Sequence, residues 1–244
     1  MLLNCLDKKL PLWFRPRVRG HFGGPSFFMT YNMRTYIYID GFNFYYGAVK
    51  NTQFKWLDFK KLLQYLLDPK HQIISIKYFT ALVSGKIDPG QPIRQKTYIR
   101  ALKTFIPEIS VYMGHFTTHN VTKPIAYPID KRLFGKKIKF VKVIKSEEKG
   151  SDVNLAVHLL NDAWQDLYDC AVVISNDSDL SEAFKLVEHQ HKKMIGLLTP
   201  WRSNPSNELL RYTKFNKTVR KSALSRSQLP DPIPGTTLHK PPVW

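Results

Sequence analysis

The stretch TYIYID, residues 35–40, is a short apolar run of β-branched and aromatic residues that ends on an acidic residue. Such runs are typical of strands buried on both faces of a sheet. Similar runs recur at residues 73–80, 109–116, 171–175 and 194–198. Between the runs, apolar residues follow a helical spacing at residues 58–67, 92–105, 151–164 and 179–189. This alternation predicts an α/β fold with a mostly parallel central sheet and helices on both faces.

One segment breaks the alternation. In residues 136–145, KKIKFVKVIK, lysines lie beside alternating apolar residues, which is typical of an edge strand. We expect this strand to pair antiparallel with the strand near Val111. Residues 117–135 lie between the two, have no periodicity and are long for a loop in a compact domain, so we expect a mobile flap there.

The two ends of the chain differ from its middle. Residues 1–32 have no periodicity and are interpreted as a leader or upstream extension. Residues 217–244 form a basic tail rich in Pro and Ser, which we expect to be either disordered or docked. The patterned domain therefore covers residues 33–216.

The composition narrows the functional classes. In 244 residues, 37 Lys and Arg stand against 19 Asp and Glu, a net charge of +18 that favours a polyanionic partner such as nucleic acid. A basic surface without a partner remains the alternative. Cys5 and Cys170 lie far apart, which excludes a disulfide framework and fits a reducing cytoplasm. No apolar stretch approaches the ~20 residues that a membrane span needs, so we expect no membrane insertion.

Acidic residues follow two of the predicted strands and open one helix. Asp40 ends the first strand, Asp177 and Asp179 follow the strand at 171–175, and Asp152 lies at a helix start. In open α/β sheets, ligands bind at the carboxyl ends of the strands, so we expect these carboxylates to converge. Because gathered carboxylates repel one another, a cation is expected among them, and oxygen ligands without Cys or His favour Mg²⁺ or Mn²⁺ over zinc.

Each acidic position also has a structural explanation. Asp179 has the spacing of a capping box with Glu182, and Asp152 complements a helix dipole. Asp177 and Asn43 suit turns. No P-loop and no GxGxxG motif follows a strand, which removes the common nucleotide-binding interpretations.

Taken together, four segments resemble the NYN family of PIN-like nucleases, and within it the bacterial LabA-like branch. They are YIDGFNFYYG at 38–47, EKGSDVNLAVHLL at 148–160, VVISNDSDLSEAF at 172–184 and SNELLRYTKF at 206–215. The resemblance implies a Rossmann-like PIN fold and a Mg²⁺- or Mn²⁺-dependent ribonuclease. The last segment departs from the family, because Thr213-Lys214 stands where relatives often have Ala-Asp.

The resemblance also implies roles for single residues. Asp40, Asp152 and Asp177 would hold the metal, which activates a water for attack on a phosphodiester. Asp179 would support them or hold a second metal. Asn43 and Ser175 would orient the carboxylates by hydrogen bonds.

The basic residues suggest a substrate surface. Lys149, next to the acidic residues, is a candidate phosphate contact or a residue of an exposed turn. Lys96, Arg100 and Lys103 lie on one helix face, which either binds phosphates or is merely solvated. The aromatic residues around Asn43 either stack on unpaired bases or, for at least two of them, pack in the core: Phe42, Phe44, Tyr45 and Tyr46.

The sequence thus predicts a metal-dependent ribonuclease that acts on single-stranded RNA, with RNA favoured over DNA. The alternative is a catalytically weak RNA-binding or scaffold module with the same fold. A phosphotransferase of the haloacid-dehalogenase type is disfavoured, because its first strand should end in D-x-D and Phe42 occupies the second of those positions.

Overall fold

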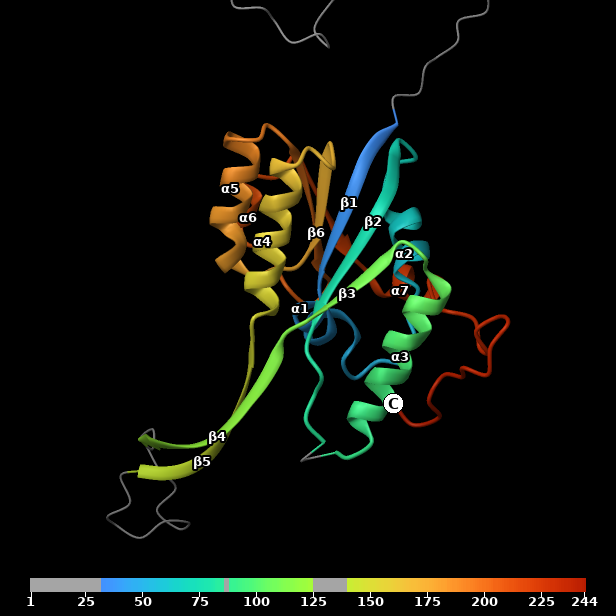
Figure 1. Cartoon of the computed structure of the whole chain (residues 1–244), viewed down its shortest axis with the longest axis vertical. Helices are drawn as coiled ribbons and strands as arrows, with labels where there is room; N and C mark the ends of the chain where they lie inside the picture. The colour runs from blue at the N-terminus through green and yellow to red at the C-terminus, as the bar shows by residue number, and fades with distance from the viewer. Residues whose placement is uncertain (1–31, 86–87, 125–139) are drawn as a thin grey trace, which may run out of the picture. The chain divides into compact units, whose positions relative to one another are not determined.

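The structure is a computed structural model that describes residues 32–85, 88–124 and 140–244. The expected leader therefore lies outside the described residues, apart from Asn32. Eight strands are present in the described ranges (Figure 1): β1 (Met33–Asp40), β2 (His71–Thr80), β3 (Ile109–Met113), β4 (His115–Pro124), β5 (Phe140–Lys149), β6 (Cys170–Ile174), β7 (Met194–Pro200) and β8 (Phe215–Val219).

The helices alternate with these strands. The longer ones are α2 (Phe59–Leu66), α3 (Gln91–Phe105), α4 (Ser151–Trp164) and α5 (Ser181–His189). Short turns of helix complete the chain: α1 (Gly41–Phe44), the π-helical turn η2 (Tyr45–Val49), the 3₁₀ turn η3 (Ser178–Leu180), α6 (Asn207–Leu210) and α7 (Lys221–Arg226). No helix among the described residues is long and apolar enough to span a bilayer.

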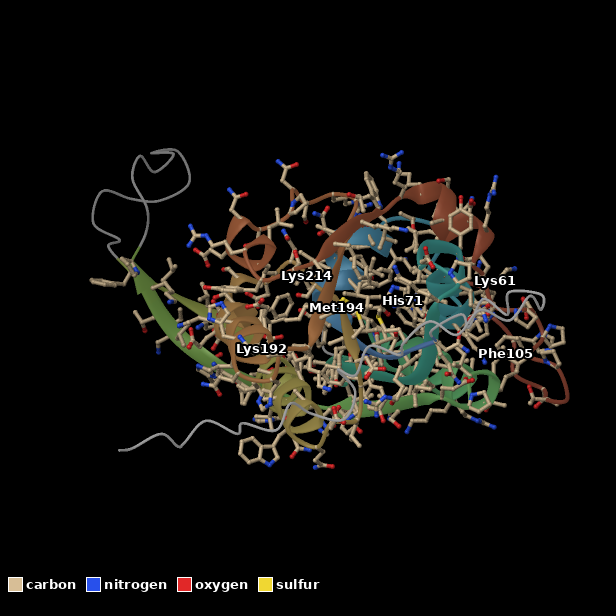
Figure 2. All side chains as sticks on the ribbon, turned by 90° about the horizontal axis from the view of Figure 1, so that it is seen from above. Lys61, His71, Phe105, Lys192, Met194 and Lys214 are labelled. Carbon is tan, nitrogen blue, oxygen red and sulfur yellow. The ribbon has the colours of Figure 1, made fainter. Side chains whose placement is uncertain are left out.

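Six strands form a parallel sheet in the order β3-β2-β1-β6-β7-β8. The strand order reverses between β1 and β6, and this reversal is the place where open α/β sheets bind their ligands. Figure 2 looks onto the amino ends of the strands, where His71 and Met194 begin β2 and β7. The acidic residues Asp40 and Asp177 lie at the opposite, carboxyl edge.

Alternate side chains of each strand enter different cores. Ile37 and Ile39 of β1 pack in the core beneath α2, α3 and α7, whereas Tyr38 lies in the core beneath α4 and α5. Figure 1 shows these two sets of helices on opposite faces of the sheet. The predicted α/β fold with helices on both faces is therefore confirmed.

The antiparallel strand was expected in the wrong place. β5 pairs with β4 in a separate two-stranded ribbon, not with the strand near Val111. The chain leaves the sheet at Gly114, whose N–H donates to the Thr80 carbonyl (2.7 Å) and where an added Cβ would lie 2.4 Å from Glu148 Oε1. The expected flap is also partly wrong, because residues 117–124 belong to β4; residues 125–139 lie outside the described ranges.

The sheet also extends beyond the expected domain boundary, since residue 216 lies inside β8. The following segment is docked rather than detached. Leu229, Ile233 and Leu238 are buried, and the Trp56 indole donates to the Pro230 carbonyl (3.0 Å). These apolar residues enter the core singly, so they leave no period in the sequence.

Candidate metal centre

Asp40 is placed by the end of β1 and the first turn of α1. One carboxylate oxygen accepts the Asn43 N–H (2.9 Å), and the other accepts the Ser175 hydroxyl (2.9 Å). The residue is only 3% exposed. This burial is the main reason that the pKa of Asp40 is raised to about 6, and the Asn43 hydrogen bond opposes the rise.

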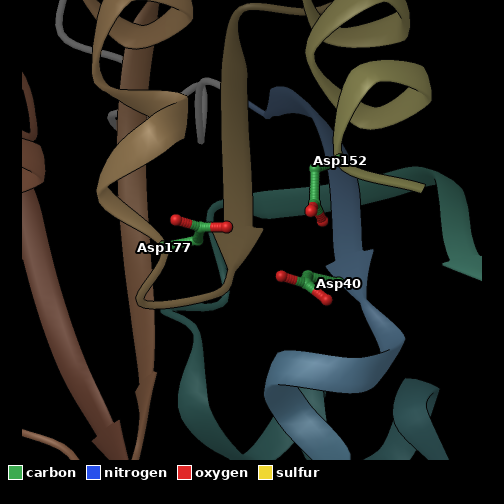
Figure 3. Close-up of side chains that lie close together, drawn as sticks. All are labelled: Asp40, Asp152 and Asp177. Atoms are coloured by element: carbon green, nitrogen blue, oxygen red, sulfur yellow. The ribbon is translucent and has the colours of Figure 1, made fainter. Parts of the chain in front are cut away.

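Two further carboxylates face Asp40 (Figure 3). Asp152 lies in the first turn of α4, and Asp177 caps the turn η3 that follows β6. One oxygen from each of the three residues can be chosen so that all lie within 4.8 Å of one another. Burial, and next the charge of Asp177, raise the pKa of Asp152. Three elements that are remote in sequence therefore gather negative charge at the point where the strand order reverses.

The donors fit a hard divalent cation. Carboxylate oxygens from three directions are the ligands that Mg²⁺, Mn²⁺ and Ca²⁺ take in proteins, and neither His nor Cys belongs to this cluster. Burial is the main reason that the pKa of Asp40 and of Asp152 is raised, and a cation would remove the repulsion between the carboxylates that adds to this rise. Asp40, Asp152 and Asp177 could therefore hold one ion.

Asn43 and Ser175 tie the two strand ends together. The Asn43 side-chain oxygen accepts the Asn176 N–H (3.0 Å), which joins the turn after β1 to the turn after β6. Ser175 donates to Asp40 and accepts the Asp177 N–H (3.1 Å). Both residues therefore position carboxylates, and Ser175 contacts two of the three.

The structure does not bring Asp179 into the group of three carboxylates. Its side chain is exposed, and its N–H donates to Asp177 (3.1 Å). It is not the N-cap of the next helix either, since α5 begins at Ser181 and Glu182 pairs with Lys185 instead. The charge of Asp179 nevertheless adds to the forces that raise the pKa of Asp152.

Glu148 is an acidic neighbour that the sequence analysis missed. It is the last but one residue of β5 and accepts both the N–H (3.0 Å) and the hydroxyl (2.7 Å) of Ser151, so it caps α4 beside Asp152. Glu148 and Ser151 have the three-residue spacing of a local cap, but the acidic residue precedes the helix rather than following its start. That spacing was the one available signal.

The acidic cluster opens into a cavity of about 620 Å³. Phe42 and Phe116 meet edge to face on its wall, with ring centroids 5.5 Å apart. Tyr46 also lines it and is 55% exposed, whereas Phe44 and Tyr45 pack with the core, as expected for two of the four aromatic residues. Arg202, which the sequence analysis missed, is the one cation lining this cavity among the described residues.

The four predicted phosphate contacts lie outside this cavity. Lys149 is exposed, and its ammonium nitrogen lies 3.7 Å from a carboxylate oxygen of Glu147. Lys96, Arg100 and Lys103 lie on the exposed side of α3, on the face of the sheet opposite α4.

Comparison with known proteins identifies the family. The sequence model of the NYN domain matches residues 34–216, three quarters of the chain. The chain belongs to the NYN domain family. The predicted family is thus confirmed, whereas membership of the LabA-like branch stays a prediction. The acidic cluster is compatible with the PIN-like nuclease character of NYN domains, whose partner is nucleic acid.

Two proteins resemble this NYN chain over most of its length. 6-Hydroxy-3-succinoylpyridine 3-monooxygenase HspA of Pseudomonas putida is 30% identical over 235 residues, which cover 87% of this chain and 75% of the relative. The crystal structure of a protein of unknown function from Vibrio parahaemolyticus has a TM-score of 0.50 and 16% identity, covering 82% of this chain and 98% of that one. The second likeness concerns the fold alone.

Proposed function

We propose that this NYN protein is a ribonuclease that hydrolyses phosphodiester bonds of single-stranded RNA with Mg²⁺ or Mn²⁺. The observation that carries the proposal is the convergence of Asp40, Asp152 and Asp177 at the reversal of the strand order. A divalent ion there would lower the pKa of a bound water and stabilise the charge of the transition state.

The side chains around the cluster have distinct roles in this proposal. Asp40, held by two hydrogen bonds, gives a fixed ligand, and Asp152 and Asp177 complete the set. Arg202 neutralises a backbone phosphate at the cavity wall, and the exposed ring of Tyr46 stacks on an unpaired base.

Residues farther out support the same reaction. Asp179 adds negative charge that strengthens the hold on the ion, or it contributes to a second ion. Lys149 and the face of α3 with Lys96, Arg100 and Lys103 hold neighbouring phosphates of the RNA.

The first experiment removes one ligand at a time. Asp152→Asn or Asp177→Asn should lower Mn²⁺-dependent cleavage of a fluorescent single-stranded RNA by at least 10²-fold, because the loss of one ligand weakens charge stabilisation by several kcal/mol. Glu208→Gln removes one charge from an exposed residue of α6 outside the cavity and should cleave as wild type.

The same proteins distinguish an enzyme from a binding module. Melting temperature should rise with Mn²⁺ for wild type and for Glu208→Gln, and less for the two Asp variants. Cleavage that persists in excess EDTA contradicts the metal-dependent site. A protein that binds RNA but neither cleaves it nor responds to the ion is the scaffold alternative, and equal cleavage of the matching DNA contradicts the preference for RNA.

A second candidate function comes from the similarity to the monooxygenase HspA of Pseudomonas putida. Its 30% identity over 87% of this chain favours oxygenation of a small pyridine compound. A monooxygenase inserts one atom of O₂ into its substrate and reduces the other to water with two electrons from a donor. Incubation with 6-hydroxy-3-succinoylpyridine, a reduced nicotinamide nucleotide and ¹⁸O₂ tests this directly, because a product without ¹⁸O excludes it.

A further inference from the structure

A second cavity lies behind the turn that follows β1. It has a volume of about 350 Å³, within the range of small-molecule sites. Aromatic side chains from α1, η2, α2, β2 and α3, together with Trp244, line much of its wall: Phe42, Tyr45, Phe59, Tyr78, Tyr98 and Trp244. Only Phe42 and Tyr46 are shared with the acidic cavity.

Several polar groups in this cavity are already used by the protein. The Gln95 amide donates to the Ala81 carbonyl (2.9 Å) and accepts the Val83 N–H (2.9 Å). The Tyr98 hydroxyl donates to the Leu57 carbonyl (2.8 Å). These two side chains therefore have little capacity left to recognise the edge of a ligand.

Lys55 is different, because its ammonium group has no hydrogen bond or ion pair anywhere in the described part of the chain. The residue is half-buried at the cavity wall. The second cation on the wall, Arg94, is paired with Asp88. Burial, and next the charge of Arg94, lower the pKa of Lys55. One positive charge is thus left uncompensated beside aromatic rings.

We propose that this cavity binds a small planar aromatic carboxylate, with the ring among the tyrosines and Trp244 and the carboxylate on Lys55. A ring gains from aromatic walls, and an anion supplies the partner that Lys55 lacks. The Gln95 and Tyr98 side chains are already hydrogen-bonded within the protein, and a nucleotide is included below as the competing ligand. The inference requires neither nuclease nor oxygenase activity.

The test is calorimetric titration, in EDTA, with four acids and their uncharged amides: benzoate, nicotinate, 4-hydroxybenzoate and indole-3-acetate. At least one acid should bind with a Kd below 1 mM and at least tenfold more tightly than its amide. Lys55→Met should raise the Kd for that acid at least tenfold, whereas Lys55→Arg, which keeps the charge, should retain most of the affinity.

Two controls isolate the cavity. Lys61→Met, on the exposed side of α2, and Asp177→Asn, in the acidic cavity, should both bind the acid as wild type. Melting curves verify that Lys55→Met is folded. The proposal is overturned if no acid binds, if acid and amide bind equally, or if Lys55→Met and Lys55→Arg behave alike. Tighter binding of uridine monophosphate than of every acid would assign the cavity to a nucleotide instead.

Discussion

Asp40 is both a structural cap and the most buried of the three clustered carboxylates. Its side chain accepts the Asn43 N–H in the first turn of α1, and it faces Asp152 and Asp177. Burial favours the protonated carboxyl, so ionisation of Asp40 in the metal-free protein costs free energy.

The pH dependence of stability follows from this cost. Since the folded-state pKa is about 6 and an Asp side chain ordinarily has a pKa of 3.8, the native state holds the Asp40 proton more tightly than the unfolded state does. The free energy of unfolding should therefore fall as pH rises from about 4 to about 6 and stay low above that. The difference corresponds to on the order of 3 kcal/mol.

Asp40→Asn should flatten this fall, and urea unfolding in EDTA at pH 4.5 and pH 7.5 measures it. The exposed Asp68→Asn is the matched control and should keep the wild-type profile. An Asp40→Asn protein that loses as much stability over this range as wild type would show that the fall arises elsewhere.

The position of a residue could be predicted where the sheet alone decides it. Asp40 ends β1, Ser175 and Asp177 follow the end of β6, and Asp152 lies in the first turn of α4, so all of them reach the carboxyl edge. Which of Asp177 and Asp179 faces the cluster depends on the dihedral angles of the turn between them, which their spacing does not reveal. The positions of Glu148 and Arg202 depend on the paths of the ribbon and of the loop after β7, which the sequence did not indicate.

At the scale of elements, a buried ion pair joins α4 to the sheet. The Lys77 ammonium of β2 lies 2.6 Å from Asp162 of α4, and the Tyr38 hydroxyl of β1 donates to the same oxygen (2.6 Å). Because Asp152 lies in the first turn of α4, this contact also holds a carboxylate of the acidic cluster over the sheet.

Lys77→Met should lower the free energy of unfolding by about 3–5 kcal/mol, since it leaves the Asp162 charge buried without its partner. The double variant Lys77→Met, Asp162→Leu should regain much of that loss. Glu182→Gln, which breaks an exposed pair with Lys185, should cost less than about 1 kcal/mol. Chemical unfolding of wild type, the two single variants and the double variant measures these free energies. A small loss of stability in Lys77→Met would mean that water reaches Asp162.

Elements with a strong period were predictable and the others were not. Five strands and four helices were expected close to where they lie. β8 was missed because FNKTV is short and largely exposed at a sheet edge. The ribbon was paired wrongly because residues 109–116 read as one strand, although the backbone leaves the sheet at Gly114.

The charge of the whole chain, +18, should make RNA binding strongly dependent on salt. Replacing Lys96, Arg100 and Lys103 with Ala should reduce the slope of log K against log salt by about 2 if all three contact phosphates, at roughly 0.7 for each. Asp177→Asn, which we expect to cleave RNA poorly, serves as the background.

The control variant replaces three exposed lysines with Ala at the amino edge of the sheet, which lies opposite the acidic cluster. These are Lys70, Lys192 and Lys214, and the last two are labelled in Figure 2. Fluorescence anisotropy at several salt concentrations gives the slopes. Equal slopes for the two triple variants would show that α3 is only a solvated face.

The order of the strands has a consequence for the synthesis of the protein. Asp40 leaves the ribosome early, but its partner carboxylates stand at positions 152 and 177, and the strand that places Asp177 pairs directly with β1. A nascent chain or a prematurely terminated product that lacks residue 177 cannot assemble the cluster. The chain being synthesised therefore cannot itself form the proposed nuclease site before residue 177 has been added.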